Sequence, residues 1–121
     1  MRRALPLLVL AAFAAAPAAA RAPTSVGVSE REWRVALYKT RVPTGVVRLN
    51  AHNYGEDGHD LAIRNRHGRV LASVPEIEPG GGDTLRVRLG KPGRYVVFCS
   101  LEGHEAKGMR ARLTAVKRKP R

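Results

Sequence analysis

Apolar and polar residues alternate along most of the chain after residue 24, and this alternation predicts short β-strands. In the segment Asp83–Leu89, the apolar residues Leu85, Val87 and Leu89 are separated by arginines. The segments Val46–Asn53 and Met109–Val116 alternate in the same way. Because successive side chains of a strand point to opposite faces of a sheet, each segment has one face for a core and one face for solvent.

Glycine and proline interrupt the alternating segments, and no helical period longer than a turn or two is present. Breaks fall at residues 65–68, 79–82 and 91–93. The pattern predicts an all-β fold over residues 23–116, an antiparallel Greek-key β-sandwich of about 7–8 strands. The expected strands are Ser25–Val28, Trp33–Leu37, Val46–Asn53, Leu61–Arg64, Val70–Val74, Asp83–Leu89, Arg94–Cys99 and Met109–Val116.

The first 22 residues differ in composition from the rest of the chain. Two arginines precede the apolar, alanine-rich run Ala4–Ala16, and small residues follow it. This order is typical of a secretory signal peptide, cleaved near residues 20–22. The alternative is a retained membrane anchor, which Pro6 and Pro17 would interrupt. We therefore expect an exported protein of the periplasm, the cell envelope or the extracellular space, with no membrane span after cleavage.

The chain is strongly basic, and this charge limits the kinds of partner that it can bind. The 121 residues carry a formal net charge of +12. Cleavage after Ala22 would remove three arginines, leaving 19 basic and 10 acidic residues, or +9 over 99 residues. Residues 117–121 form a basic tail. We expect a monomer whose positive surface is either simply solvated or meets acidic partner proteins or anionic envelope polymers, and export argues against nucleic acid.

The single cysteine of the chain, Cys99, limits the chemistry. It excludes intramolecular disulfides and every metal site that needs two thiolates from one chain. An unpaired thiol is uncommon in an exported protein, because the compartment is oxidising. Three explanations remain: a buried structural cysteine, an intermolecular disulfide, or a metal thiolate.

Extending the strand phases to the strand ends brings further metal-binding side chains toward the inner face. His59 has the phase of Leu61 and Ile63, and Cys99 and Met109 lie on the inner faces of their strands. His104 lies between them, which gives the spacing C-x₄-H-x₄-M. Two imidazoles, one thiolate and one thioether are the ligand types of a blue-copper site.

These segments resemble the small cupredoxins, the type 1 blue copper proteins of the plastocyanin and azurin family. The resemblance rests on residues 53–61 and on residues 95–109, whose loop spacing is that of auracyanin and rusticyanin. It covers nearly the whole chain after residue 24. It implies one copper ion bound by His59, Cys99, His104 and Met109, with the methionine as the axial ligand.

In this family, a pair resembling Asp60 and Ser100 links the two ligand-bearing segments. The remaining histidines, His52 and His67, are expected to be exposed and to take no part in the site. Trp33 and Tyr95 are expected to serve in packing.

The resemblance implies an electron carrier and not an enzyme, with no catalytic residues. Its expected partners are redox partner proteins with acidic docking surfaces. The alternative is a copper carrier or storage protein that uses the same ligands without redox chemistry. A small cysteine hydrolase based on Cys99 and His104 is the third interpretation.

Overall fold

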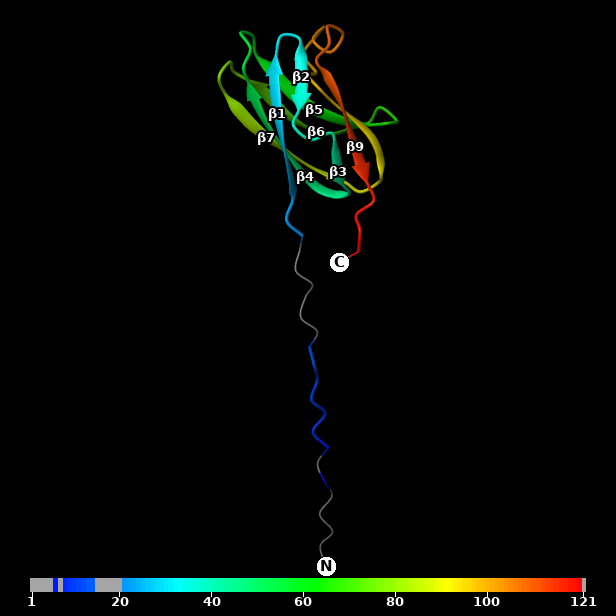
Figure 1. The fold of residues 1–121 in the computed structure, drawn as a ribbon. Helices are drawn as coiled ribbons and strands as arrows, with labels where there is room; N and C mark the ends of the chain where they lie inside the picture. The colour runs from blue at the N-terminus through cyan, green and yellow to red at the C-terminus, as the bar shows by residue number, and fades with distance from the viewer. Residues whose placement is uncertain (1–5, 7, 15–20, 121) are drawn as a thin grey trace, which may run out of the picture.

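The computed structural model describes residues 6, 8–14 and 21–120 (Figure 1). Most of the expected signal peptide, residues 1–22, and the last residue of the expected tail lie outside the described residues. No described segment is a helix of the length and apolarity needed to cross a bilayer. The strands are β1 (Thr24–Arg31), β2 (Arg34–Leu37), β3 (Arg41–Pro43), β4 (Gly45–Asn53), β5 (His59–Asn65), β6 (Val70–Ile77), β7 (Gly82–Leu89), β8 (Gly93–Phe98) and β9 (Arg110–Val116).

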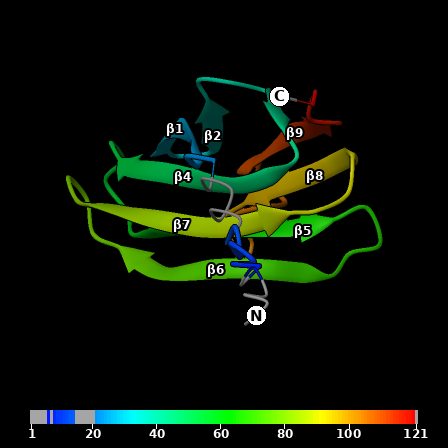
Figure 2. The ribbon, with the colours of Figure 1, turned by 90° about the horizontal axis from the view of Figure 1, so that it is seen from below.

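The strands form two sheets that pack face to face (Figure 2). One sheet has the order β2-β1-β4-β7, and the other has the order β3-β9-β8-β5-β6. Most neighbours are antiparallel, but β1 pairs with β4 and β3 pairs with β9 in parallel. The all-β sandwich expected from the alternation is thereby confirmed.

Two details differ from the expected antiparallel sandwich of 7–8 strands. The described chain has nine strands, because β3 is only three residues long and too short to show an alternation. The two sheets are mixed and not purely antiparallel. The chain returns along β2 in one sheet and then along β3 in the other, so it enters β4 in the same direction as β1.

The core consists of the side chains that face inward from both sheets. The expected inward phase is confirmed in β4, where Val47, Leu49 and Ala51 are buried while Arg48 and Asn50 are exposed. Other fully buried side chains of the core include Val26, Leu61, Ile63, Leu85, Leu89 and Leu113. At one end of the sandwich the same inward faces carry polar and sulfur-containing side chains, which form the site described next.

Candidate metal centre

The four residues expected to bind copper lie at one end of the sandwich. His59 is the first residue of β5, Cys99 follows β8 directly, and Met109 immediately precedes β9. All three are fully buried. His104, in the loop between β8 and β9, is only partly buried. The inward direction that the strand phases predicted for His59, Cys99 and Met109 is therefore confirmed.

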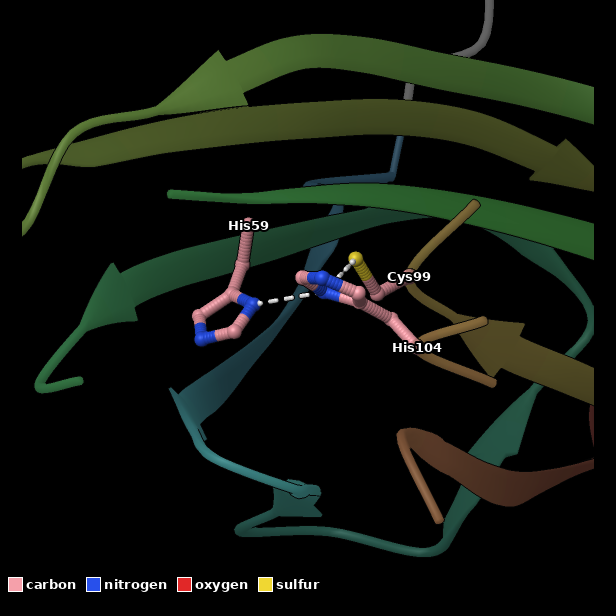
Figure 3. Close-up of side chains that lie close together, drawn as sticks. All are labelled: His59, Cys99 and His104. Atoms are coloured by element: carbon pink, nitrogen blue, oxygen red, sulfur yellow. Dashed lines mark hydrogen bonds between the residues drawn. The ribbon is translucent and has the colours of Figure 1, made fainter. Parts of the chain in front are cut away.

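Three of these side chains converge on one point (Figure 3). The ligand atoms of His59, Cys99 and His104 all lie within 4.8 Å of one another. The two Nδ1 atoms of His59 and His104 are 3.2 Å apart. The Cys99 sulfur is 3.6 Å from Nδ1 of His104. No other group of three or more His, Cys, Asp or Glu side chains in the described part of the chain is arranged in this way.

The separations match those expected around one metal ion. Metal–nitrogen bonds of about 2.0–2.1 Å and metal–sulfur bonds of about 2.3 Å, as for Zn²⁺, place neighbouring ligand atoms roughly 3.1–3.6 Å apart at near-tetrahedral angles. Both the Nδ1–Nδ1 separation and the Sγ–Nδ1 separation fall in that interval. One thiolate with two imidazoles is also the donor set that selects copper. The cluster therefore fits a copper ion in both geometry and donor chemistry.

The loop between β8 and β9 holds Met109 beside the cluster through its backbone. The amide of Cys99 donates to the carbonyl of Met109 at 3.1 Å, and the amide of Met109 donates to the carbonyl of His104 at 3.2 Å. Gly108 has a φ of +126°, and a Cβ there would lie 2.8 Å from the carbonyl oxygen of Trp33. Only glycine combines that backbone conformation with so close an approach.

Glu32 fixes the orientation of His59, and the sequence pattern did not reveal this role. Nε2 of His59 lies 2.9 Å from Oε1 of Glu32. The same carboxylate accepts hydrogen bonds from the amides of Asp57, at 2.7 Å, and Glu56. The hydrogen bond from Asp57 is the main reason that the pKa of Glu32 falls to about 2. Because an ionised carboxylate only accepts, Nε2 of His59 carries a proton and Nδ1 is directed to the cluster.

Trp33 is a second residue of the site that sequence reasoning assigned only to packing. Its ring contacts His104 edge-to-face, with 4.9 Å between ring centroids. Nζ of Lys107 lies 4.1 Å from the centre of the Trp33 ring. The indole therefore covers one side of the cluster, and a lysine from the ligand loop covers the indole in turn.

Asp60 connects the two segments that carry the ligands, as expected from the family resemblance. Its Oδ1 accepts from the amide of Ser100 at 2.5 Å, and its Oδ2 accepts from the Ser100 hydroxyl. Since Asp60 follows His59 and Ser100 follows Cys99, this pair fixes the start of β5 against the end of β8. The positions of His59 and Cys99 relative to each other are thereby fixed.

Burial of Cys99 bears on the other interpretations of this residue. The thiol is free and has no exposed surface, so it is not placed to form an intermolecular disulfide. Burial raises the pKa of the Cys99 thiol to about 11. A cysteine nucleophile needs a lowered pKa and an accessible sulfur, so the hydrolase interpretation is not supported.

Glu30 is a buried carboxyl near this end of the sandwich. Its side chain is fully buried, and neither oxygen has a hydrogen-bond partner among the described residues. Burial, with a smaller contribution from the charge of Asp60, raises the pKa of Glu30 to about 8. The side chain is therefore mainly protonated at neutral pH.

The two remaining histidines lie outside the cluster. His52 is half-buried and packs against the ring of Tyr54, with 4.2 Å between centroids. His67 is exposed in the turn between β5 and β6. Tyr95 is buried in the core, as expected.

Comparisons with known proteins find similarity in structure and not in sequence. No protein-family model and no curated protein sequence matches the chain. A reduced auracyanin from Roseiflexus castenholzii aligns with a TM-score of 0.65 and 21% identity, over 79% of this chain and 99% of that chain. An azurin from Methylomonas sp. strain J aligns with a TM-score of 0.67 and 19% identity, over 79% of this chain and 100% of that chain.

A larger protein contains the same fold as a part. The copper-containing nitrite reductase from Thermus scotoductus aligns with a TM-score of 0.62 and 17% identity, over 84% of this chain but 33% of that chain. Identities this low establish the fold, and the cluster provides the chemistry. The chain therefore has the cupredoxin fold, with a His59–Cys99–His104 cluster that fits a type 1 copper site.

Proposed function

We propose that this protein is an exported type 1 blue copper protein that binds one copper ion and carries single electrons between redox partners. The observation that carries the proposal is the convergence of Nδ1 of His59, Nδ1 of His104 and the Cys99 sulfur. We assign these three as equatorial ligands and the Met109 sulfur as the axial ligand. A copper ion held there would supply the Cu(I)/Cu(II) couple.

The surroundings of the cluster support electron transfer through His104. His59 and Cys99 are fully buried, whereas His104 is partly exposed. The same loop carries exposed small residues, including Gly103 and Ala106. Such a surface suits brief docking of a partner, because small, weakly polar contacts give short-lived complexes.

The ligand framework also supports a redox role because it resists rearrangement. Glu32 fixes the ring of His59, and Asp60 ties the two ligand segments together. A site whose ligands move little between two oxidation states exchanges electrons quickly. We expect no substrate to be turned over.

The direct test is addition of Cu(II) to the purified metal-free protein. We expect an intense visible blue absorption band from the cysteine thiolate, with one copper bound per chain. Cys99→Ala should abolish the band, and His59→Ala should abolish or strongly alter it. His52→Ala is the matched control, since it removes a histidine outside the cluster and should leave the band unchanged. A colourless protein that binds no copper would refute the proposal.

The alternative, a copper carrier or storage protein, uses the same ligands. The full burial of Cys99 favours the electron carrier, because a copper carrier needs metal ligands that a partner protein can reach. Reversible voltammetry with rapid electron exchange, and slow transfer of copper to a chelator, is expected of an electron carrier. Rapid copper transfer with poor electron exchange would instead assign the protein as a copper carrier.

We also propose that residues 1–22 are a signal peptide and that the protein acts as a monomer in the periplasm or outside the cell. Mass determination of the protein recovered from the producing cells tests the cleavage of the signal peptide directly. A mature N-terminus near residue 23 is expected.

A further inference from the structure

Acidic side chains are confined to one end of the sandwich along the strand direction, whereas basic side chains occur at both ends. All ten acidic residues of the sequence fall in residues 30–32, 56–60, 76–83 and 102–105. These segments are the connections β1–β2, β4–β5, β6–β7 and β8–β9, together with the strand ends beside them (Figure 1). They lie at the end that carries the His59–Cys99–His104 cluster, which we call the metal end. The other end, which we call the basic end, is formed by the remaining connections and by both ends of the sandwich chain. It contains no acidic residue.

Two adjoining hollows shape the basic end. The larger, of about 820 Å³, is lined by four basic side chains of the sandwich: Arg48, Arg86, Arg88 and Arg118. Arg48 and Arg86 lie directly opposite each other on β4 and β7. Like charges in opposite positions on neighbouring strands are destabilising, so the fold retains an unfavourable arrangement here.

The smaller hollow, of about 360 Å³, shares Arg88 with the first. Arg66, Arg69, Lys91 and Arg94 line the rest of its basic rim. Neither these four nor the four arginines of the larger hollow form an ion pair within the described part of the chain. The ion pairs of arginine lie at the metal end, where Arg64 and Arg110 contact Glu105. Eight cationic side chains are thus left without carboxylate partners around the basic end and on the adjoining exposed face of β4 and β7.

From this arrangement we infer that the basic end docks on an anionic phospholipid surface. Guanidinium groups match the geometry of phosphate oxygens and are more weakly hydrated than ammonium groups. Seven of the eight unpaired side chains are arginines. Each Lys or Arg held near an anionic membrane strengthens binding about fivefold.

The path of the chain selects a membrane over another polyanion. Arg21, Ala22 and Pro23 line the larger hollow, so the chain enters the sandwich at the basic end. Six residues, 17–22, separate the apolar run Ala4–Ala16 from Pro23. The seven Cα–Cα steps from Ala16 to Pro23 span at most about 25 Å. Before cleavage, a bilayer that held this run would therefore lie within that distance of the basic end, so export would release the sandwich with its basic end beside the membrane.

A redox partner is a poor occupant of the same surface. The eight residues of β7 separate the two ends by roughly 25 Å, so a protein docked at the basic end would be remote from His104. Docking on a membrane would instead direct the metal end away from the bilayer, where a partner can reach it. That orientation draws on the proposed function, but the docking itself does not depend on copper.

Vesicle binding of the copper-free protein, in the form that cells export, tests the inference. We expect sedimentation with vesicles of phosphatidylglycerol and phosphatidylcholine at low salt, and none with pure phosphatidylcholine or in 0.5 M NaCl. The double variant Arg86→Gln, Arg88→Gln should bind about 25-fold more weakly. The control Arg31→Gln, Arg34→Gln removes the same charge near the β1–β2 turn, at the metal end, and should lose less than fivefold.

Three results would overturn the inference. Equal losses in the two double variants would show attraction to net charge alone. Salt-resistant binding to pure phosphatidylcholine would assign binding to an apolar N-terminal run that cells had not removed. Binding to polyglutamate without binding to vesicles would point to an acidic protein. Because no copper is present, none of these results bears on the blue-copper proposal.

Discussion

Glu30 provides a prediction whose size follows from its burial. The carboxyl has a pKa of about 8 in the folded protein against 4.5 as its ordinary value. Between these values the unfolded chain has released a proton that the folded protein retains. Folding stability attributable to Glu30 therefore falls as pH rises above 4.5, and the loss is complete above pH 8. The expected cost is on the order of 3 kcal/mol at pH 7, because each pH unit contributes about 1.4 kcal/mol.

Replacing Glu30 with glutamine removes this dependence while keeping the shape of the side chain. Relative to the wild type, the free energy of unfolding of Glu30→Gln should increase by about 2–3 kcal/mol between pH 5 and pH 7. Urea unfolding of the copper-free protein, followed by the fluorescence of Trp33, measures this change. The test uses the change with pH of the difference in free energy of unfolding between variant and wild type. The absolute difference is less informative, because a buried amide without partners adds a cost of about 1–3 kcal/mol that does not depend on pH.

The control for this experiment is Glu78→Gln, which removes an exposed carboxyl at the same end of the sandwich. Its effect on the free energy of unfolding should stay within about 0.5 kcal/mol, as for most surface substitutions. A difference between wild type and Glu30→Gln that is the same at pH 5 and pH 7 would refute the reasoning. It would mean that Glu30 ionises alike in the folded and unfolded states.

Three further predictions concern the ligands and the core. Glu32→Gln should lower Cu(II) affinity about 10- to 100-fold in equilibrium dialysis, because the carboxylate orients His59, whereas Glu56→Gln should leave it unchanged. Met109→Leu should keep the blue colour and raise the reduction potential in voltammetry, and an unchanged potential would remove the methionine from the axial role. Leu61→Ala should reduce the free energy of unfolding by about 2–5 kcal/mol in urea, because it leaves a cavity in the core, and a loss under 1 kcal/mol would contradict that packing.

Strand phase made much of the fold and the cluster predictable from the sequence. His59 lies inward because it shares the phase of Leu61, and Cys99 lies inward because it shares the phase of Val97. The loop that adds His104 joins two strands that are adjacent in the sheet. Side chains whose direction follows from the period of a strand can thus be placed without knowledge of the tertiary structure.

The residues that support the cluster could not be found in this way. Glu32 and Trp33 lie in the turn between β1 and β2, where no alternation fixes the direction of a side chain. Their contacts with His59 and His104 arise only when the two sheets pack together. Glu30 shows the opposite case, because its phase with Val26 and Val28 predicts burial but its polarity argues against it. The parallel pairing of β1 with β4 likewise depends on the path through the second sheet.

The position of β9 has a consequence for how the protein is made. This strand is the last of the described strands, yet it lies between β3 and β8 inside its sheet. Until residues 110–116 leave the ribosome, β3 has no neighbour and β8 has an open edge. The sandwich therefore closes only after residues 110–116 have been made, and a shorter nascent chain has neither a finished core nor an assembled cluster. Such a chain is still unfolded, which is the state that the proposed export through a translocation channel would require.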